Sequence, residues 1–569
     1  MRPRYIQHKP LAELSSMSSD TDTNDEPHIA SGPAPTNASN AAPRPTKRSW
    51  ALGALGGVVA AGAGLGVAEL VAGTSRQLQS PVLDVGDRFI DLTPRPLKEQ
   101  AIQWFGTNDK KALLVGIAII LIGYAMFVGV LALRRRLLPA MIGIGAFGLV
   151  GAVSSVTTRR QAPLVAIIPS VVGAVIAAGV LVVLHRVAYR DQPSTAQPLP
   201  TTADSPSTSS IAQLVPNDRR RFLAAVGIAG VAATAAGISG RKLKSSSGAA
   251  ASRNSLSLPL AEQPLDAAPS TISTDAVGAN PFFTPNANFY RIDTALTVPQ
   301  IPLDDWSLKI SGLVDNPMTL SFQDLISREL VEADVTLTCV SNEVGGTLMG
   351  TARWLGIRLD DLLNDVGVKA DADQIVGRSI DGYSCGFPVS ALDGRNALIA
   401  IGMNGEPLPL EHGFPARLIV PGLYGYVSAT KWLTELNLTR FDQFDQYWVE
   451  RGWVDNAPIK LSSRIDTPRG LSKVAAGTIA IAGVAWSQTV GISAVEVSID
   501  DGPWQPTTLA DELNNETWRQ WSFAWDAAPG RHGITVRAID KNGAIQTDTR
   551  SEPFPSGATG QHQIVVIVK

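Results

Sequence analysis

Cysteine and histidine are scarce in this chain of 569 residues, which contains two cysteines and six histidines. Two cysteines exclude a disulfide framework and a zinc-ribbon site. The formal net charge is −3, so the chain lacks the basic field that nucleic-acid-binding proteins carry. Aromatic residues make up only 6% of the chain, yet ten of the 12 tryptophans follow residue 280. This uneven distribution predicts two halves of different character.

The first half contains four long runs of Ala, Val, Gly, Leu and Ile with few charges. They cover residues 50–73, 112–133, 137–156 and 163–184, and each is close to the ~20 residues that cross a bilayer. Buried helices of a soluble fold are the alternative, but four such runs in close succession would leave too little polar surface. We therefore predict a four-helix transmembrane region over 49–190. A tail over 1–48, rich in Pro, Ser, Thr and Asn, is predicted to be disordered and cytoplasmic.

A fifth apolar segment follows paired arginines. Arg219 and Arg220 precede Phe222, Leu223 and the Ala/Gly-rich stretch 224–240. This pattern resembles a twin-arginine export signal placed internally, and the alternative is a plain fifth helix with positive flanking charge. Either interpretation predicts a fifth transmembrane segment over 218–240.

Two segments of linker composition border this fifth span. Residues 191–217 are rich in Pro, Ser and Thr, and we expect a linker there. Residues 241–280 are rich in Ser, Ala and Pro, and we expect a flexible tether. The tether would connect the membrane region to everything that follows.

The positively charged residues between the runs predict an orientation. Lys47, Arg48 and the arginines at 134–136, 186–190 and 219–221 fall on one side if the N-terminus is cytoplasmic. Arg159 and Arg160 are a mild counter-signal. Five spans would place residues after 240 on the extracytoplasmic side of a multi-pass protein of the cell membrane. Because no span contains a pair of histidines, we expect no haem in this chain.

The second half alternates short strands with short helices. Residues 306–312 alternate as a strand does, and residues 319–330 predict a helix with Ser321 as its N-cap. A β-branched run at 335–340 places Cys339 at the end of a strand, before a Gly-containing loop. Such a cysteine can present a thiolate to a metal. The alternatives are a small buried apolar residue or a nucleophile with His412 as its base.

Three motifs resemble those of the sulfite oxidase-like molybdopterin oxidoreductases. Residues 336–346 are similar to the metal-binding segment, 288–291 to a pterin-contacting segment, and 411–432 to the third cofactor segment. The resemblance covers about 281–569, with the α+β cofactor domain over 281–454. It implies one molybdenum–molybdopterin cofactor per chain, with Cys339 as both the catalytic residue and the only protein ligand to the metal.

The same resemblance implies which residues hold the pterin and its phosphate. A buried phosphate needs cationic donors, and arginine supplies a planar fork for it. The cofactor-binding residues implied by these motifs and by a neighbouring loop are Asn288, Tyr290, Arg291, Asp381, His412, Arg417, Ala429, Thr430 and Lys431. The other cysteine, Cys385, is interpreted as a small buried residue in preference to a redox-active or second-ligand thiol.

One departure from the family puts sulfite oxidation in doubt. Sulfite oxidases place arginines just after the ligand cysteine, whereas this chain has Asn342, Glu343 and Val344. A carboxylate there would disfavour an anionic substrate. Distant arginines are the alternative source of positive charge, with Arg353, Arg358 and Arg464 as the candidates. The reductase branch of the family, which includes periplasmic methionine sulfoxide reductase, is an equally good analogue.

The last segment, 455–569, contains alternating runs at the spacing of a β-sandwich. It resembles the immunoglobulin-like dimerisation domain of the family, so a homodimer is implied by analogy.

The predicted function is two-electron oxygen-atom transfer on a small oxyanion, sulfoxide or N-oxide. The expected partners are membrane lipid, a small-molecule substrate and a separate quinone-linked or haem electron-transfer protein, but no nucleic acid. The alternative is a non-catalytic membrane-tethered protein that displays a β-sandwich for binding.

Overall fold

The computed structural model describes residues 47–569 with several gaps. The gaps are 76–77, 95–96, 98–99, 101–103, 106–108, 134–135, 158–163, 190–215 and 246–247. The predicted disordered tail and the linker at 191–217 therefore lie almost entirely outside the described residues.

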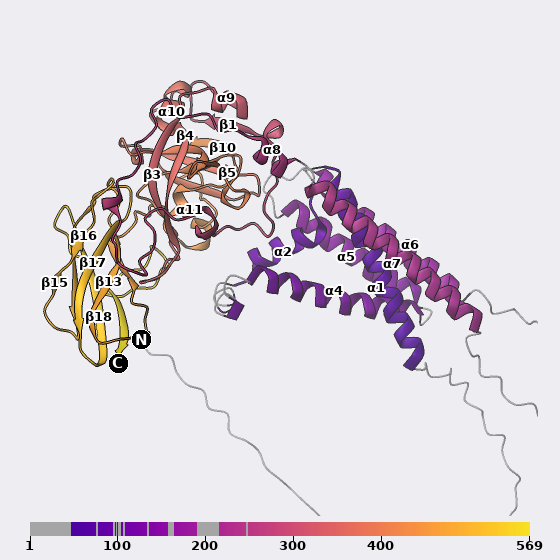
Figure 1. Cartoon of the computed structure of the whole chain (residues 1–569). Coiled ribbons are helices and arrows are strands. Elements are labelled where there is room, and N and C mark those ends of the chain that lie inside the picture. Colours follow the sequence, from indigo (N-terminus) through magenta and orange to yellow (C-terminus); the bar gives the residue numbers. More distant parts are fainter. Residues whose placement is uncertain are drawn as a thin grey trace, which may run out of the picture. The chain divides into compact units, whose positions relative to one another are not determined.

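Five helices of the N-terminal half are long and apolar enough to span a membrane. They are α1 (Lys47–Gly73), α4 (Asp109–Leu133), α5 (Leu137–Thr157), α6 (Ile168–Tyr189) and α7 (Pro216–Ser245) (Figure 1). Each contains one of the five predicted runs almost entirely, so the helices expected from composition are confirmed. A shorter helix, α2 (Pro81–Leu92), lies between the first two.

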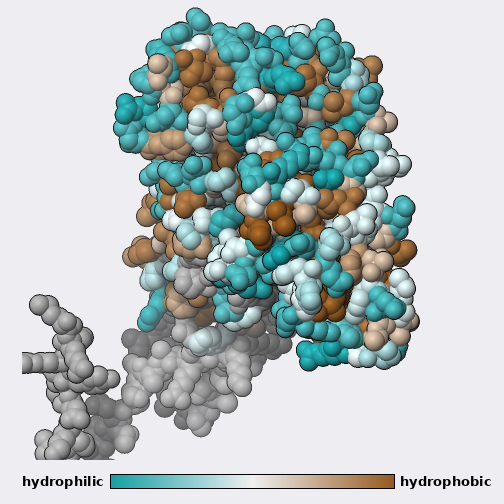
Figure 2. All heavy atoms as spheres, turned by 90° about the vertical axis from the view of Figure 1, so that its left-hand side faces the viewer, coloured by the Kyte–Doolittle hydropathy of each residue, from teal (hydrophilic) through white to brown (hydrophobic). Residues whose placement is uncertain are grey.

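Small residues let these helices approach closely. A Cβ atom placed on Gly57 would lie 1.9 Å from the carbonyl oxygen of Ala125, and one on Gly64 would lie 2.4 Å from that of Gly173. Small residues at such crossings are typical of helix association in lipid. Large apolar side chains instead point outward, as Ile119 and Ile120 do at 65% and 70% exposed. The face shown in Figure 2 differs from the surface of these helices, because hydrophilic residues are interspersed with hydrophobic ones over it.

One mixed sheet and one antiparallel sheet form the domain that follows the membrane helices in the sequence. The first has the order β2-β1-β10-β5-β6, and the second has the order β3-β4-β7-β8 with β9 paired to β7 (Figure 1). Their bounds are β1 Ser307–Gly312, β2 Met318–Ser321, β3 Val331–Thr338, β4 Met349–Arg358, β5 Gln374–Ser379, β6 Ser384–Pro388, β7 Leu398–Met403, β8 Glu406–Pro407, β9 Arg417–Ile419 and β10 Leu433–Thr439. Short helices α8 (Ala249–Ser255), α9 (Phe322–Ile326), α10 (Leu359–Val366) and α11 (Gly425–Ser428) connect or cover them.

The helix predicted over 319–330 is shorter than expected. Met318–Ser321 is strand β2, and α9 ends at Ile326. Ser321 is its N-cap, as predicted, and accepts a hydrogen bond from the backbone N–H of Asp324 at 3.1 Å. The carboxylate of Asp324 in turn accepts from the backbone N–H of Ser321, which completes a capping box.

The predicted tether over 241–280 is also corrected in part. Arg253, in α8, donates to the carbonyl oxygen of Leu408 at 2.9 Å. Ala261 and Ile272 are buried in the core of the β-rich domain. This segment therefore packs against the domain from residue 249 onward instead of running free, because its scattered apolar residues find partners far away in the sequence.

The C-terminal strands form two further sheets over one core. Their orders are β11-β13-β17-β16 and β12-β19-β18-β14-β15. The bounds are β11 Ser462–Thr467, β12 Lys473–Val474, β13 Gly477–Trp486, β14 Ile492–Ile499, β15 Gln505–Pro506, β16 Thr508–Leu509, β17 Arg519–Ala527, β18 Gly530–Asp540 and β19 His562–Val568. Ile481 and Trp521 of one sheet share a core with Val536 and Val566 of the other. The immunoglobulin-like character and the dimer remain predictions.

Candidate cofactor site

Cys339 is the first residue after β3, where the sequence predicted it. Its backbone N–H donates to the carbonyl oxygen of Leu348 at 3.0 Å, and its own carbonyl oxygen accepts from the backbone N–H of Asn342 at 3.0 Å. The side chain of Asn342 is buried and accepts from the backbone N–H of Leu348 at 2.8 Å. These bonds close the loop over 339–348 on itself, so the position of the thiol is fixed by the backbone.

Burial governs the ionisation of Cys339. The residue is 8% exposed. Burial raises the pKa of the thiol, although hydrogen bonds from Ser341 and the charge of Lys431 partly oppose this. The free thiol is therefore protonated at neutral pH, and a metal bound there would displace its proton.

A hollow of about 840 Å³, including its open mouth, lies over Cys339. Five of the predicted site residues line it, namely Tyr290, Cys339, Asp381, Ala429 and Lys431. Burial raises the pKa of both Tyr290 and Asp381. The hydroxyl of Tyr290 therefore keeps its proton throughout the physiological pH range.

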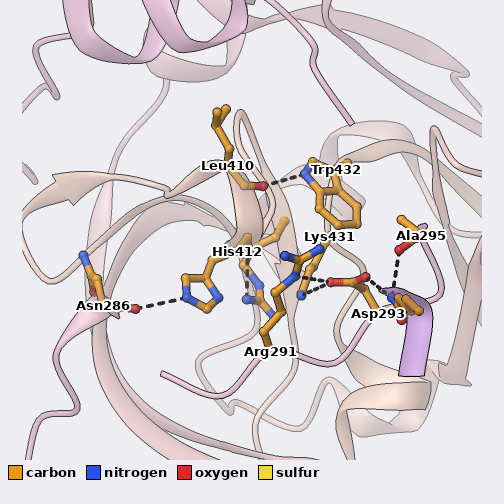
Figure 3. A network of polar contacts seen from close by, with 10 residues as sticks. Asn286, Arg291, Asp293, Ala295, Leu410, His412, Lys431 and Trp432 are labelled. Atoms are coloured by element: carbon orange, nitrogen blue, oxygen red, sulfur yellow. Dashed lines mark hydrogen bonds and ion pairs between the residues drawn. The ribbon is translucent and has the colours of Figure 1, made fainter. Parts of the chain in front are cut away.

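Cationic side chains converge on one carboxylate at the edge of this hollow (Figure 3). Asp293 accepts from Arg291 at 2.8 Å and forms ion pairs with Lys431 at 3.1 Å and Lys110 at 2.9 Å. Burial alone would raise the pKa of Asp293, but the neighbouring ammonium groups and the Arg291 guanidinium lower it. Burial lowers the pKa of Lys431 to about 8, so this ammonium group still carries its charge at pH 7. The three cations exceed the single negative charge between them.

Arg417 adds a further buried cation without a carboxylate. It is 4% exposed, and its guanidinium carbon lies 5.1 Å from the centre of the Trp354 ring. Its Nη1 donates to the carbonyl oxygen of His412 at 3.1 Å, but its Nε has no partner among the described residues. Burial lowers the pKa of Arg417 to about 10. An uncompensated buried guanidinium is costly in an apo protein, which indicates a site for an anion.

His412 lies beside this guanidinium as a neutral ring. Burial, together with the charges of Arg417 and Lys431, lowers the pKa of His412 to about 4. Its Nε2 is 3.2 Å from the carbonyl oxygen of Asn286, whereas Nδ1 is buried without a partner among the described residues (Figure 3). A neutral imidazole of this kind can donate to or accept from a ligand. The groups that shift the pKa of the Cys339 thiol, besides burial, are Ser341 and Lys431 and not His412, so the nucleophile–base alternative gains no support.

Besides Arg291, His412 and Arg417, two further predicted residues do not line the hollow. Asn288 is exposed at the end of a short 3₁₀ helix, Asn286–Asn288. Thr430 is fully buried, and its hydroxyl is 2.9 Å from the sulfur of Cys385. Cys385 is fully buried in the core, and burial raises the pKa of its thiol to about 11. Cys385 is therefore a packing residue, as the sequence suggested, and Thr430 supports it.

The structure adds residues that the sequence did not single out. Asp293 is one of them, although it stands only two residues after Arg291. The others are aromatic walls of the hollow, namely Tyr383, Tyr426, Trp432, Trp448 and Trp453. The cluster of aromatic residues at 447–453 was the available signal, but its position over the site depends on the tertiary fold.

The residue expected to repel anions does not do so directly. Glu343 is exposed and is not among the residues that line the hollow. None of the three candidate arginines lines it either. Arg353 is paired with Asp334 through two bonds of 2.9 Å, and Arg464 is bound to Asp466 and to the carbonyl oxygen of Gly346. The lining described here therefore contains no arginine.

The residues present fit a molybdopterin cofactor. A buried thiol lines the hollow, and surplus positive charge with unused hydrogen-bond donors lies beside it. The Cys339 thiolate would bind the metal. The phosphate would be bound by Arg417, Lys431 and Arg291.

Comparison with known proteins identifies the family to which this chain is similar. The oxidoreductase molybdopterin binding domain family matches residues 295–448. Human mitochondrial sulfite oxidase is 29% identical over 318 residues, which are 47% of this chain and 58% of that protein. The uncharacterized oxidoreductase YuiH of Bacillus subtilis is 32% identical over 173 residues, which are 30% of this chain and 84% of that protein. Among solved structures, the sulfane dehydrogenase SoxCD from Paracoccus pantotrophus is 21% identical, with a TM-score of 0.46, over 51% of this chain and 84% of that chain.

The chain belongs to the sulfite oxidase-like molybdopterin oxidoreductases. It is an enzyme of that family with a molybdenum–molybdopterin cofactor, and the non-catalytic alternative is set aside. It spans about 58% of the length of the mammalian sulfite oxidases that it matches.

Proposed function

We propose that this protein is a membrane-anchored, extracytoplasmic enzyme that transfers one oxygen atom, with two electrons, to or from a small uncharged S-oxide or N-oxide. The observation that carries this proposal is the lining of the hollow over Cys339, which is aromatic and contains no arginine among the described residues. One cofactor per chain, no haem in the chain, and a separate electron-transfer partner belong to the same proposal.

Electrostatics support an uncharged substrate over an oxyanion. The hollow is lined by two carboxyl groups, Asp293 and Asp381, and the one cation among the described lining residues, Lys431, is already paired with Asp293. Arg291 and Arg417 lie outside this lining, and in this proposal they and Lys431 bind the cofactor phosphate. The lining therefore offers little to a doubly charged anion that must leave water. The rings of Tyr383, Trp448 and Trp453 instead offer apolar faces, which suit the methyl or alkyl groups of a sulfoxide or an amine oxide.

Each polar residue has a place in this proposal. When bound, molybdenum supplies the two-electron redox chemistry and the oxygen-accepting centre. Cys339 would hold the metal and would donate electron density through its thiolate. Arg417 and Lys431 would hold the phosphate away from water, where each charge-assisted bond is strong. The protonated hydroxyl of Tyr290 donates a hydrogen bond to the substrate oxygen.

A dye-linked assay of the purified full chain tests the substrate. We expect reduced viologen to be oxidised by dimethyl sulfoxide or trimethylamine N-oxide, and we expect sulfite to reduce ferricyanide at less than about a hundredth of that rate. The comparison uses one enzyme batch of known molybdenum content, so that poor cofactor loading lowers both rates together. Sulfite oxidation as the dominant activity would contradict the proposal.

Sidedness rests on the distribution of positive charge and on the paired arginines. We expect a reporter fused after residue 245 to be active only outside the cytoplasm. Replacing Arg219 and Arg220 by lysine should abolish that activity if export uses the twin-arginine route, whereas the same change at Arg159 and Arg160 should not. A reporter active only inside would refute the five-span topology.

A further inference from the structure

A second hollow lies among the membrane helices, away from the cofactor residues. It encloses about 770 Å³, including its open mouth, within the ~300–1,000 Å³ that small-molecule sites usually occupy. Helices α1, α4, α5 and α6 form its walls, and α2 contributes Pro81 and Val85. The described residues that line it include no charged side chain, and only Ser170 and Tyr124 bring a polar atom.

Ser170 is the chemically informative residue of this lining. It is 5% exposed, and its hydroxyl has no hydrogen-bond partner among the described residues. Buried hydroxyls are almost always paired, because leaving one unpaired costs free energy. Ser155 of the neighbouring helix shows the usual arrangement, since it donates to the carbonyl oxygen of Ala152 at 2.8 Å. The unpaired hydroxyl of Ser170 therefore indicates an acceptor that a ligand supplies.

An aromatic pair lies on the same hollow. The rings of Tyr124 and Phe147 have centroids 6.1 Å apart and are inclined by 32°, and both line it. The hydroxyl of Tyr124 is satisfied by the carbonyl oxygen of Gly143 at 2.9 Å. The pair therefore presents ring surface, which favours another flat ring. The rest of the lining is Gly, Ala and aliphatic residues, which suit a hydrocarbon chain.

We propose that this hollow binds a lipid-soluble quinone. Its ring would lie against Tyr124 and Phe147, one ring carbonyl would accept a hydrogen bond from Ser170, and the isoprenoid tail would follow the small residues of α1 and α6. A phospholipid headgroup does not fit, because a phosphate needs cationic donors and the described lining has none. In the proposed topology, Ser170 lies near the extracytoplasmic start of its span. The binding does not depend on molybdenum chemistry.

The test is the affinity of the detergent-purified full chain for a benzoquinone with a short tail, measured by titration calorimetry. Ser170→Ala should weaken binding by about tenfold, the effect of losing one hydrogen bond. Ala61→Phe should eliminate binding, because Ala61 lines the hollow and the larger ring would fill it. Ser155→Ala, on a buried serine that does not line it, and Val175→Phe, at a position 64% exposed, are the matched controls and should leave the affinity unchanged.

Extraction of lipids from the same preparations shows whether the hydrocarbon chain in the hollow belongs to a quinone or to a phospholipid. A quinone that co-purifies with the native chain and is lost in Ala61→Phe supports the proposal. An extract that contains phospholipid but no quinone overturns it, as does an affinity unaffected by both Ser170→Ala and Ala61→Phe. Circular dichroism of each variant confirms that its helices are retained. Because the assay needs no substrate of the molybdenum site, its failure is separate from a failure of the proposed oxygen-atom transfer.

Discussion

Replacing Cys339 by serine is expected to abolish turnover, lowering it by more than about 100-fold. Altering groups that merely support a metal ligand already costs ~10- to 100-fold, and this change removes the ligand atom itself. The serine hydroxyl does not ionise at neutral pH, so it cannot replace the thiolate donor. The side chains are close in size, and the loop is held by backbone bonds and by Asn342, so the fold should survive.

The measurement is dye-linked turnover together with molybdenum-edge X-ray absorption. The spectrum of the Cys339→Ser protein should show one sulfur ligand fewer than that of the native protein. Cys385→Ser is the matched control, because this thiol is also buried but contacts Thr430 in the core. We expect Cys385→Ser to retain turnover within about twofold. Full turnover, or an unchanged sulfur count, in Cys339→Ser would disprove the ligand assignment.

Arg417→Leu is expected to separate cofactor retention from apo-protein stability. Arg417 is buried without an ion-pair partner among the described residues, so the apo protein bears the cost of its desolvation. Leucine removes that cost but also the contact with Trp354, and the free energy of unfolding of the apo protein should change by less than about 1 kcal/mol. The phosphate would lose its buried fork, and the purified protein should contain almost no molybdenum.

Arg353→Leu is the control, and we expect it to destabilise the apo protein without lowering its molybdenum content. Arg353 forms two bonds with Asp334, which is 2% exposed, and lies outside the lining of the cofactor hollow. Its loss leaves a buried carboxylate unpaired, which should destabilise the protein by about 3 kcal/mol. Molybdenum content per folded chain should stay unchanged. Denaturant unfolding of the apo proteins and metal analysis of the loaded ones give the two quantities. A marked destabilisation of apo Arg417→Leu with full molybdenum content would refute the anion-site interpretation.

Local signals predicted some elements well and others poorly. The strand before Cys339 and the cap at Ser321 depend on neighbouring residues, and both are present. The helix predicted over 319–330 ends at Ile326 because the chain then begins strand β3 at Val331. The local apolar pattern does not predict where that strand begins. The segment 241–280 was predicted to be a tether because its apolar residues are sparse. Its contacts are with distant residues, as when Arg253 donates to the carbonyl oxygen of Leu408, 155 positions away.

The sequence by itself predicted the five helices that are long and apolar enough to span a membrane, and it singled out Cys339 as the candidate metal ligand. Both are properties of contiguous residues: a bilayer requires ~20 apolar residues in succession, and the cofactor motif is an unbroken segment. Only the tertiary structure decided which groups meet. Asp293 forms an ion pair with Lys431, 138 positions away; aromatic residues line the same hollow as Cys339; and Ser170 lines an apolar hollow. Such convergence depends on packing between distant segments, and no local pattern encodes it.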